Sequence, residues 1–358
     1  MAMLMRQELP ERELNDISRR LEPVASGLKD ARILLTGGTG FVGSWLAESF
    51  LNLERRCRLN ADLVILTRDI EGYLDRRPHM RARPRLHLHQ GDLRRAESLP
   101  GIEGITHVIH AGSDVNRRMS PSDALRMLDT LDLGTEHLLH ASRAWPLRRC
   151  LYISSAAVYG PDSGGGEWTE HSPGCPSALD ATSAYGMGKR IAELRVALHG
   201  ACNGFSSIIA RLGALIGPLL PLDGGFAAGN FLSNALCGEK ILVKGDGTAI
   251  RSYQYAGDLA VWLWTLLLCG KPGEAYNVGG DAPLSLADLA RMIDRLRGTI
   301  GVDIQGETDP RRPVDRYCPS VRKAVEELGL ANRTSLEEAI LKTLDWLRGP
   351  TASPEGMS

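Results

Sequence analysis

The chain has 358 residues, of which 43% are hydrophobic and 24% charged, and its formal net charge is −1 at pH 7. These values are ordinary for a globular protein, so the composition excludes a disordered or fibrous chain. A charge close to zero gives no long-range attraction to nucleic acid or to an anionic membrane, and we expect neither as a partner. The length allows one large α/β domain with a smaller appendage.

The seven cysteines favour a reducing compartment, because their number is odd and no pair has C-x-x-C spacing. Residues 1–20 are charged and lack a continuous apolar run, so we expect no signal peptide. The longest apolar stretch, Leu259 to Cys269, is too short to span a bilayer and predicts a buried helix. We therefore expect a cytoplasmic protein without a metal site.

Strand-like and helix-like segments alternate along the chain, after an amphipathic helix predicted over Glu11 to Leu28. This alternation is typical of an α/β fold with a doubly wound parallel sheet that helices cover on both faces. The predicted strands are Ala31–Thr36, Leu63–Thr67, Leu86–Leu88, His107–Ala111, Cys150–Ser154 and Ser207–Leu212, and the predicted helices are Phe41–Arg55, Leu125–Arg143 and Tyr185–His199.

A run of arginines lies between residues 76 and 85. Such a run could bind phosphate groups, but no aromatic residues are interleaved with it for base stacking. We interpret it as a solvated loop. Its members are Arg76, Arg77, Arg81, Arg83 and Arg85.

Beyond Gly213 the pattern becomes irregular, because glycines and prolines interrupt it. We interpret this region as a smaller C-terminal α/β part that packs over the carboxyl edge of the sheet, where open α/β sheets bind ligands. The predicted divisions are an N-terminal helical extension (1–29), the main domain (30–212), a mainly C-terminal substrate-binding part (213–349) and a tail (350–358). The elements expected after residue 213 are Lys240–Val243, Leu259–Leu268, Ala275–Val278, Leu286–Leu296 and Leu336–Leu347.

A glycine-rich loop follows the first predicted strand and opens the next helix, with Gly37, Gly40 and Gly43 in G-x-x-G-x-x-G spacing. The first glycine allows a tight turn, the second lets the backbone approach a pyrophosphate, and the third allows close packing of helix and strand. Free N–H groups at the start of the helix attract phosphate charge. The loop predicts a dinucleotide site formed by Gly37, Thr39, Gly40, Phe41, Val42 and Gly43.

The end of the second strand bears on the choice of cofactor. NAD-specific enzymes generally place a carboxylate there for the ribose 2′-hydroxyl, whereas this chain has Thr67 followed by Arg68. An arginine can pair with a 2′-phosphate, which favours NADP, and the carboxylate of Asp69 keeps NAD open. We further expect cofactor contacts from Asp92 and Leu93 after the third strand and from Ala111 at the end of the fourth.

Tyr185 and Lys189 have Y-x-x-x-K spacing on a predicted helix, so their side chains share one face. A nearby ammonium favours the phenolate and lowers the tyrosine pKa, which allows Tyr185 to remove a hydroxyl proton while hydride leaves the same carbon. Lys189 can also hold the nicotinamide ribose. Ser155, after the fifth strand, would steady charge on the reacting oxygen, and we interpret Ser154 as structural.

Together these motifs resemble the extended short-chain dehydrogenase/reductases, a family of NAD(P)-dependent enzymes that includes nucleotide-sugar epimerases and dehydratases. The resemblance implies a Rossmann fold, a nucleotide-diphosphate sugar as substrate, and a homodimer formed through the helices at 125–143 and 185–199. It also implies that Arg251 and Arg312 grip the diphosphate, with Asn230 as a further donor. The segments that carry it are Thr36–Gly43, Ser154–Gly160, Tyr185–Lys189, Arg251–Asp258, Tyr276–Gly279, Arg312–Asp315 and Tyr317–Ser320.

The chain departs from the family pattern at several positions. Leu131 stands where family members usually carry asparagine, and Ala214 stands at a second position where many members carry asparagine. Ala156 and Ala157 stand where the 4,6-dehydratases carry the acid and base that eliminate water, and methyl groups transfer no protons. We therefore expect a nucleotide-sugar epimerase that acts by hydride transfer at C4. An NADPH-dependent 4-ketoreductase is the alternative, followed by a 4,6-dehydratase and a non-catalytic nucleotide sensor.

Overall fold

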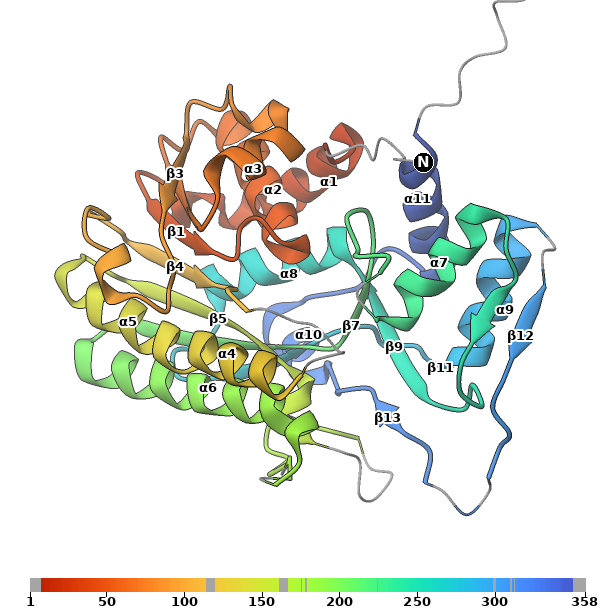
Figure 1. The fold of residues 1–358 in the computed structure, drawn as a ribbon. Helices are drawn as coiled ribbons and strands as arrows, with labels where there is room; N and C mark the ends of the chain where they lie inside the picture. Colours follow the sequence, from red (N-terminus) through yellow and green to blue (C-terminus); the bar gives the residue numbers. More distant parts are fainter. Residues whose placement is uncertain are drawn as a thin grey trace, which may run out of the picture.

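The computed structural model of the protein describes residues 8–113, 120–160, 167–174, 176–177, 179–223, 225–298, 301–309, 311 and 313–349. Seven parallel strands form its main sheet in the order β10-β6-β5-β4-β1-β2-β3 (Figure 1), which confirms the predicted doubly wound α/β fold. The strands are β1 (Arg32–Thr36), β2 (Asp62–Thr67), β3 (Leu86–Gln90), β4 (His107–His110), β5 (Arg149–Ser155), β6 (Ser206–Leu212) and β10 (Ala275–Val278).

Helices cover both faces of this sheet because the strands are apolar on both sides. Ile33 and Leu35 of β1 belong to one buried cluster, whereas Leu34 between them belongs to the other. The first face carries α1 (Glu11–Leu21), α2 (Phe41–Cys57) and α8 (Ala256–Cys269), which contact one another. The opposite face carries α4 (Pro121–Leu131), α5 (Leu133–Ala141) and α6 (Ala184–Asn203).

The helix predicted over Leu125 to Arg143 is two helices. The break lies at Asp132, whose backbone angles of φ −92 and ψ −68 depart from the helical values. A capping box starts α4, since Ser120 and Asp123 exchange hydrogen bonds between side chain and backbone. Two further short helices are α3 (Ile70–Arg76), which follows β2, and α10 (Arg322–Leu328), which contacts β10.

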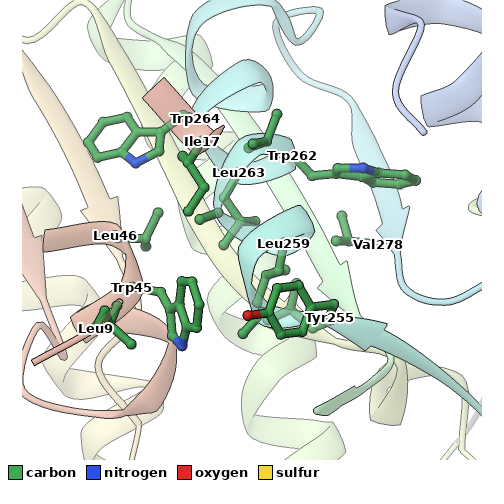
Figure 2. Close-up of a cluster of buried hydrophobic side chains, with 14 of the residues drawn as sticks. Leu9, Ile17, Trp45, Leu46, Tyr255, Leu259, Trp262, Leu263, Trp264 and Val278 are labelled. Atoms are coloured by element: carbon green, nitrogen blue, oxygen red, sulfur yellow. The ribbon is translucent and has the colours of Figure 1, made fainter. Parts of the chain in front are cut away.

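The N-terminal extension is part of the core. Leu9 and Ile17 are each 2% exposed and lie beside α2 and α8 (Figure 2), and a 3₁₀ segment over Glu22–Leu28 follows α1. Trp45 of α2 and Trp264 of α8 are fully buried in the same cluster. No helix in the described ranges is long and apolar enough to cross a membrane.

The arginine run is only partly a solvated loop, and here the interpretation from sequence is corrected. Arg77 is 3% exposed, because it donates a hydrogen bond to buried Glu48. The other Glu48 oxygen accepts from the backbone N–H of Leu9 at 3.1 Å. Arg77 therefore ties the loop to α2 and to the N-terminal extension.

The C-terminal part forms two small sheets beside the main one. Strand β9 (Ile250–Tyr255) pairs with β7 (Ala214–Ile216), β11 (Pro283–Ser285) and β13 (Arg316–Tyr317), while β8 (Ile241–Val243) pairs with β12 (Val302–Ile304). Helices α7 (Ala227–Cys237), α9 (Leu286–Arg297) and α11 (Leu336–Arg348) surround them. Because β10 returns to the main sheet and α8 covers it, residues after 212 also build the main domain.

Candidate active site

The glycine loop joins β1 to α2 in a conformation that the glycines require. Gly37 has a φ of +69°, and a β-carbon there would lie 2.5 Å from the carbonyl oxygen of Ala111. A β-carbon on Gly43 would lie 2.1 Å from the Gly37 oxygen, so both positions exclude side chains. Gly40 starts α2 and no side chain caps the helix.

The bare start of α2 is suited to a cofactor pyrophosphate, since uncapped N–H groups and the helix dipole attract negative charge. Gly40 is exposed, and Thr39, Phe41 and Val42 are half-buried, so the loop remains accessible from outside. The expected residues of the loop therefore lie together at the carboxyl end of β1, next to the point where the strand order reverses between β1 and β4.

The end of β2 presents an arginine rather than a carboxylate. Arg68 is exposed, whereas the carboxylate of Asp69 accepts a hydrogen bond from the Gly72 N–H at 2.9 Å and caps α3. Asp92 is also engaged, because Arg94 Nε lies 3.0 Å from its Oδ1 atom. Hydrogen bonding to Arg94 is the main cause that lowers the pKa of Asp92.

His110 organises the strand end beside the cofactor loop, and sequence analysis gave it no role. Its Nδ1 lies 2.7 Å from the Thr36 hydroxyl and its Nε2 lies 2.9 Å from the Thr135 hydroxyl. Burial lowers the pKa of His110 to about 3, so the ring is neutral at physiological pH. Thr36 also accepts from the Gly112 N–H at 3.0 Å, which fixes the backbone next to Ala111.

Ser155, Tyr185 and Lys189 lie together where β5 ends and α6 begins. Ser155 is the last residue of β5, and its hydroxyl accepts from the Ala157 N–H at 3.2 Å. Tyr185 lies on the first turn of α6, with the Lys189 Nζ 5.8 Å from its ring centroid. Lys189 is 1% exposed and donates to the carbonyl of Ile153 at 2.6 Å.

Burial shifts the pKa values of Tyr185 and Lys189, an effect that the sequence did not indicate. Desolvation raises the pKa of Tyr185, with a further increase from the nearby Tyr317 and partial compensation by hydrogen bonds from Ser155 and Ser113. Desolvation also lowers the pKa of Lys189 to about 7, although the charge of Glu193 opposes this. The expected lowering of the tyrosine pKa by Lys189 is therefore absent from this structure.

A buried hydrogen-bond network anchors α6, the helix that carries Tyr185 and Lys189, to the main sheet. Ser154 donates to Glu193 Oε1 at 2.5 Å, and the Arg211 NH2 group lies 2.7 Å from Glu193 Oε2. Arg211 also donates to the Tyr159 hydroxyl at 3.0 Å, which in turn donates to Asn277 Oδ1 at 2.7 Å. Ser154 thus has a structural partner, and the network links β5, α6, β6 and β10.

Tyr317 brings the C-terminal part to the catalytic serine. Its hydroxyl lies 2.9 Å from the Ser155 Oγ, although the two residues are 162 positions apart. Its ring lies 5.7 Å from the Arg251 guanidinium, which donates to Asp315 Oδ2 at 2.6 Å. The motif around Tyr317 was visible in the sequence, but nothing local to it indicated this contact.

The structure places the expected substrate residues unequally. Arg251 lies on β9 and contacts the ring of Tyr317, whose hydroxyl lies beside Ser155. One residue therefore separates Arg251 from the catalytic cluster. Asn230 lies on the first turn of α7 and takes no part in the contacts that join Arg251 to Ser155. Arg312 falls outside the described residues.

A separate hollow of about 820 Å³ lies on the other side of β9. Ile250 and Arg316 line it, whereas their neighbours Arg251 and Tyr317 face the catalytic side, as alternation along a strand requires. Its lining includes none of Ser155, Tyr185 and Lys189, and its polar residues are Asp246, Thr248, Ser285, Asp288, Arg291, Thr308 and Arg316.

Comparison with known proteins places this arrangement among enzymes of nucleotide-linked sugars. A family model described as "NAD dependent epimerase/dehydratase family" matches residues 33–279. A dTDP-glucose 4,6-dehydratase of Streptomyces antibioticus is 27% identical over 346 residues, with 90% of this chain and 98% of the relative covered. UDP-glucuronic acid decarboxylase 6 of Arabidopsis thaliana is 28% identical over 312 residues, with 86% of each chain covered.

Solved structures agree with the fold. The dTDP-glucose 4,6-dehydratase DesIV of Streptomyces venezuelae, determined with NAD bound, superposes with a TM-score of 0.76 at 25% identity and covers 88% of this chain and 97% of its own. The UDP-glucose 4-epimerase of Thermotoga maritima, determined with UDP-glucose, gives a TM-score of 0.75 at 20% identity, with 88% and 98% covered. The second similarity supports the fold alone.

Proposed function

Because the chain belongs to the NAD-dependent epimerase/dehydratase family, we propose that it epimerises a nucleotide-linked sugar by oxidising and re-reducing it at C4. The observation that carries this proposal is the pair Ala156 and Ala157 directly after Ser155. A hydride-transfer set thus stands without acid and base groups at the two positions next to it. Ala156 is fully buried, so its position offers no polar atom to a substrate.

In the proposed reaction, Tyr185 as phenolate removes the proton from the sugar O4 while hydride leaves C4. Ser155 donates a hydrogen bond to that oxygen, and Lys189 favours the phenolate when it is charged. When bound, the cofactor supplies an acceptor and later a donor for the hydride. The 4-keto sugar would turn within the site before C4 regained hydride on its other face, and Tyr185 would return the proton to O4. Such a cycle would consume no cofactor.

Water elimination needs further groups that take a proton from C5 and give one to the leaving hydroxyl. Two carboxylates of the neighbouring elements already have partners, since Glu193 binds Arg211 and Glu170 accepts from the Asn277 N–H at 2.7 Å. His171 lines a different pocket with Ser320, so it is not a substitute. General acid–base groups contribute roughly 10²–10⁴-fold each, and their absence disfavours dehydration.

The substrate diphosphate is proposed to bind the C-terminal part, residues 213–349. Arg251 is the best-placed cation, because it lies beside Tyr317 and its partner Asp315 has a 66% exposed side chain. An exposed partner is readily exchanged for a phosphate, to which a guanidinium binds in a forked geometry. Arg312 and Asn230 are proposed as its companions on the strength of the family resemblance.

We propose NADP as the preferred form of the cofactor. Arg68 is exposed at the end of β2, where a guanidinium suits a 2′-phosphate, while Asp69 caps α3. A preference for NADP would also suit the alternative reaction, in which the enzyme reduces a 4-keto sugar nucleotide and consumes NADPH. The two reactions differ in whether the reduced cofactor is used up.

We also propose a homodimer built on α4 and α6, which lie side by side at the lower left of Figure 1. Four apolar residues on these helices are exposed, with exposures of 64% for Leu125, 61% for Leu194, 55% for Leu198 and 39% for Ile191. Grouped exposed apolar residues of this kind mark association surfaces. The four helices of two copies would bury them.

The proposed function is tested by incubating the protein with UDP-, dTDP-, CDP- and GDP-sugars and reading product stereochemistry by NMR. We expect a C4 epimer from one of them, without net consumption of cofactor. No nucleotide-glucose should yield a 4-keto-6-deoxy sugar. Tyr185→Phe should abolish turnover and retain cofactor binding.

Three outcomes separate the candidates. Stoichiometric oxidation of NADPH by a 4-keto sugar nucleotide would replace the epimerase by the ketoreductase. Efficient formation of 4-keto-6-deoxy sugar would refute both, and Asp223 would then be the first residue to mutate. Binding of cofactor without turnover of any sugar in the panel would indicate the nucleotide sensor.

A further inference from the structure

The hydroxyl of Ser155 is already surrounded by hydrogen-bond partners. It accepts from the Ala157 N–H at 3.2 Å and lies 2.9 Å from the Tyr317 hydroxyl. Because the Tyr317 hydroxyl donates to the carbonyl of Leu212 at 3.3 Å, the single O–H donor of Ser155 is directed at Tyr317. A substrate oxygen can accept a hydrogen bond from Ser155 only if Tyr317 leaves.

Of these two partners only Tyr317 can leave without loss of the site, because the Ala157 N–H is fixed by the backbone turn that follows β5. The hydrogen bond from Tyr317 to the carbonyl of Leu212 is long at 3.3 Å, so it holds the phenol only weakly in this position.

Tyr317 is also connected to the proposed diphosphate site. It belongs to the two-residue strand β13 and is paired in register with Arg251 on β9. Its ring packs edge-on against Trp168 with centroids 6.0 Å apart, and the Arg251 guanidinium lies 5.7 Å from the same ring. Short strands are held by few hydrogen bonds, so this segment is able to shift while β9 remains in place.

We propose that the Tyr317 hydroxyl occupies the position of the sugar's reacting hydroxyl, and that the substrate binds by displacing it from Ser155. The inference rests on the proposed function, since it requires a sugar hydroxyl as the ligand of Ser155. Tyr317 is then a positioning residue that competes with the sugar and leaves the nucleotide unaffected. It keeps Ser155 hydrogen-bonded and aligned between turnovers.

The test compares two ligands that differ only in the sugar. Equilibrium dialysis with radiolabelled UDP-, dTDP-, CDP- and GDP-glucose counts bound ligand whichever epimer it has become, and the four nucleoside diphosphates serve as sugar-free references. Tyr317→Phe should increase the affinity for the nucleotide-linked glucose by about 2- to 10-fold, the range of one hydrogen bond. The affinity for the matching diphosphate should not change.

A double-mutant cycle makes the role of Ser155 explicit. In a Ser155→Ala background, Tyr317→Phe should give no gain, because the contact is already lost. Tyr276→Phe is the matched control: its hydroxyl donates to Glu327 Oε2 at 2.9 Å, remote from Ser155, and its loss should leave both affinities unchanged.

Weaker binding of the glucose conjugate to Tyr317→Phe would overturn the inference, since Tyr317 would then be a direct sugar ligand. An equal change for conjugate and diphosphate, or the same gain with and without Ser155, would overturn it as a general structural effect. Failure of the parent protein to bind any of the eight ligands would overturn the proposed function, and the inference with it.

Discussion

Gly186, on the first turn of α6, lies directly against the carbonyl group of Ala157. A β-carbon at position 186 would come within 2.4 Å of the Ala157 oxygen, whereas ordinary contact begins at 3.4 Å. The same turn carries Tyr185, and the N–H of Ala157 is bonded to Ser155. The spacing between the catalytic tyrosine and serine therefore depends on a residue without a side chain.

Gly186→Ala should separate these two residues. Alanine improves helix propensity by about 0.5–1 kcal/mol, but overpacking costs roughly 1–3 kcal/mol, so the free energy of unfolding should fall. A displacement near 1 Å should lower kcat/KM by about 10- to 100-fold. Chemical denaturation and steady-state kinetics measure both effects. Gly245→Ala, where a β-carbon meets nothing within 4 Å, is the control. Unchanged kcat/KM in Gly186→Ala would contradict the argument.

Arg68→Ala should distinguish the two cofactors. Loss of a charged hydrogen bond to the 2′-phosphate should weaken NADP by about 1.5–3 kcal/mol, and NAD, which lacks that phosphate, should change little. Fluorescence titration with both reduced cofactors measures this difference directly. Equal affinities of the parent protein for NAD and NADP would refute the assignment of Arg68.

Lys189 should make stability depend on pH. Its pKa is about 7 in the folded protein and 10.5 in the reference state, so between these values the unfolded chain holds a proton that the folded chain has released. Raising the pH in this window therefore favours folding. The free energy of unfolding of the parent should gain up to about 1.4 kcal/mol per pH unit relative to Lys189→Met.

Urea denaturation at pH 7, 8 and 9 measures this gain. The exposed Lys244→Met is the control, because its ammonium stays in water when the chain folds, and it should follow the parent. Parallel curves for the parent and Lys189→Met would show that Lys189 is not titrating in this window.

Leu194→Asp should give a monomer if α4 and α6 form the dimer. The side chain is 61% exposed in a single chain, so an aspartate there should alter the stability of the monomer little while placing an unpaired charge in the interface. Light scattering coupled to size exclusion should show a dimer for the parent and for Leu341→Asp, a 40% exposed position on α11. A parent protein that is monomeric at micromolar concentration would contradict the proposed homodimer.

The parts of the fold that were predictable are those with a local signal. β1 and α2 follow from an apolar run, a glycine triplet and a helical period that lie within one short segment. Y-x-x-x-K spacing likewise placed Tyr185 and Lys189 on one helix. By contrast, β9 and α7 were missed. Glycines interrupt the sequence close to both, and few of their residues are exposed, so neither shows a clear period of polar and apolar residues.

The features that escaped prediction depend on tertiary contact. The meeting of Ser155 and Tyr317 spans 162 positions, and Arg77 pairs with Glu48 across 29 positions. The pKa shifts of Tyr185 and Lys189 come from desolvation, which requires knowledge of every neighbour. A charge rule applied to Y-x-x-x-K alone therefore gave the wrong direction for the tyrosine.

The return of β10 to the main sheet has a consequence for attempts to divide the chain. Its four residues hydrogen-bond to Ile209–Leu212 of β6 and so cover what would otherwise be an open border of the sheet. A fragment that stops at residue 212 would expose an apolar strand with unsatisfied N–H and C=O groups, a template for pairing with other fragments. Such a fragment should accumulate as aggregate, and soluble expression should return only when the boundary is moved beyond Val278.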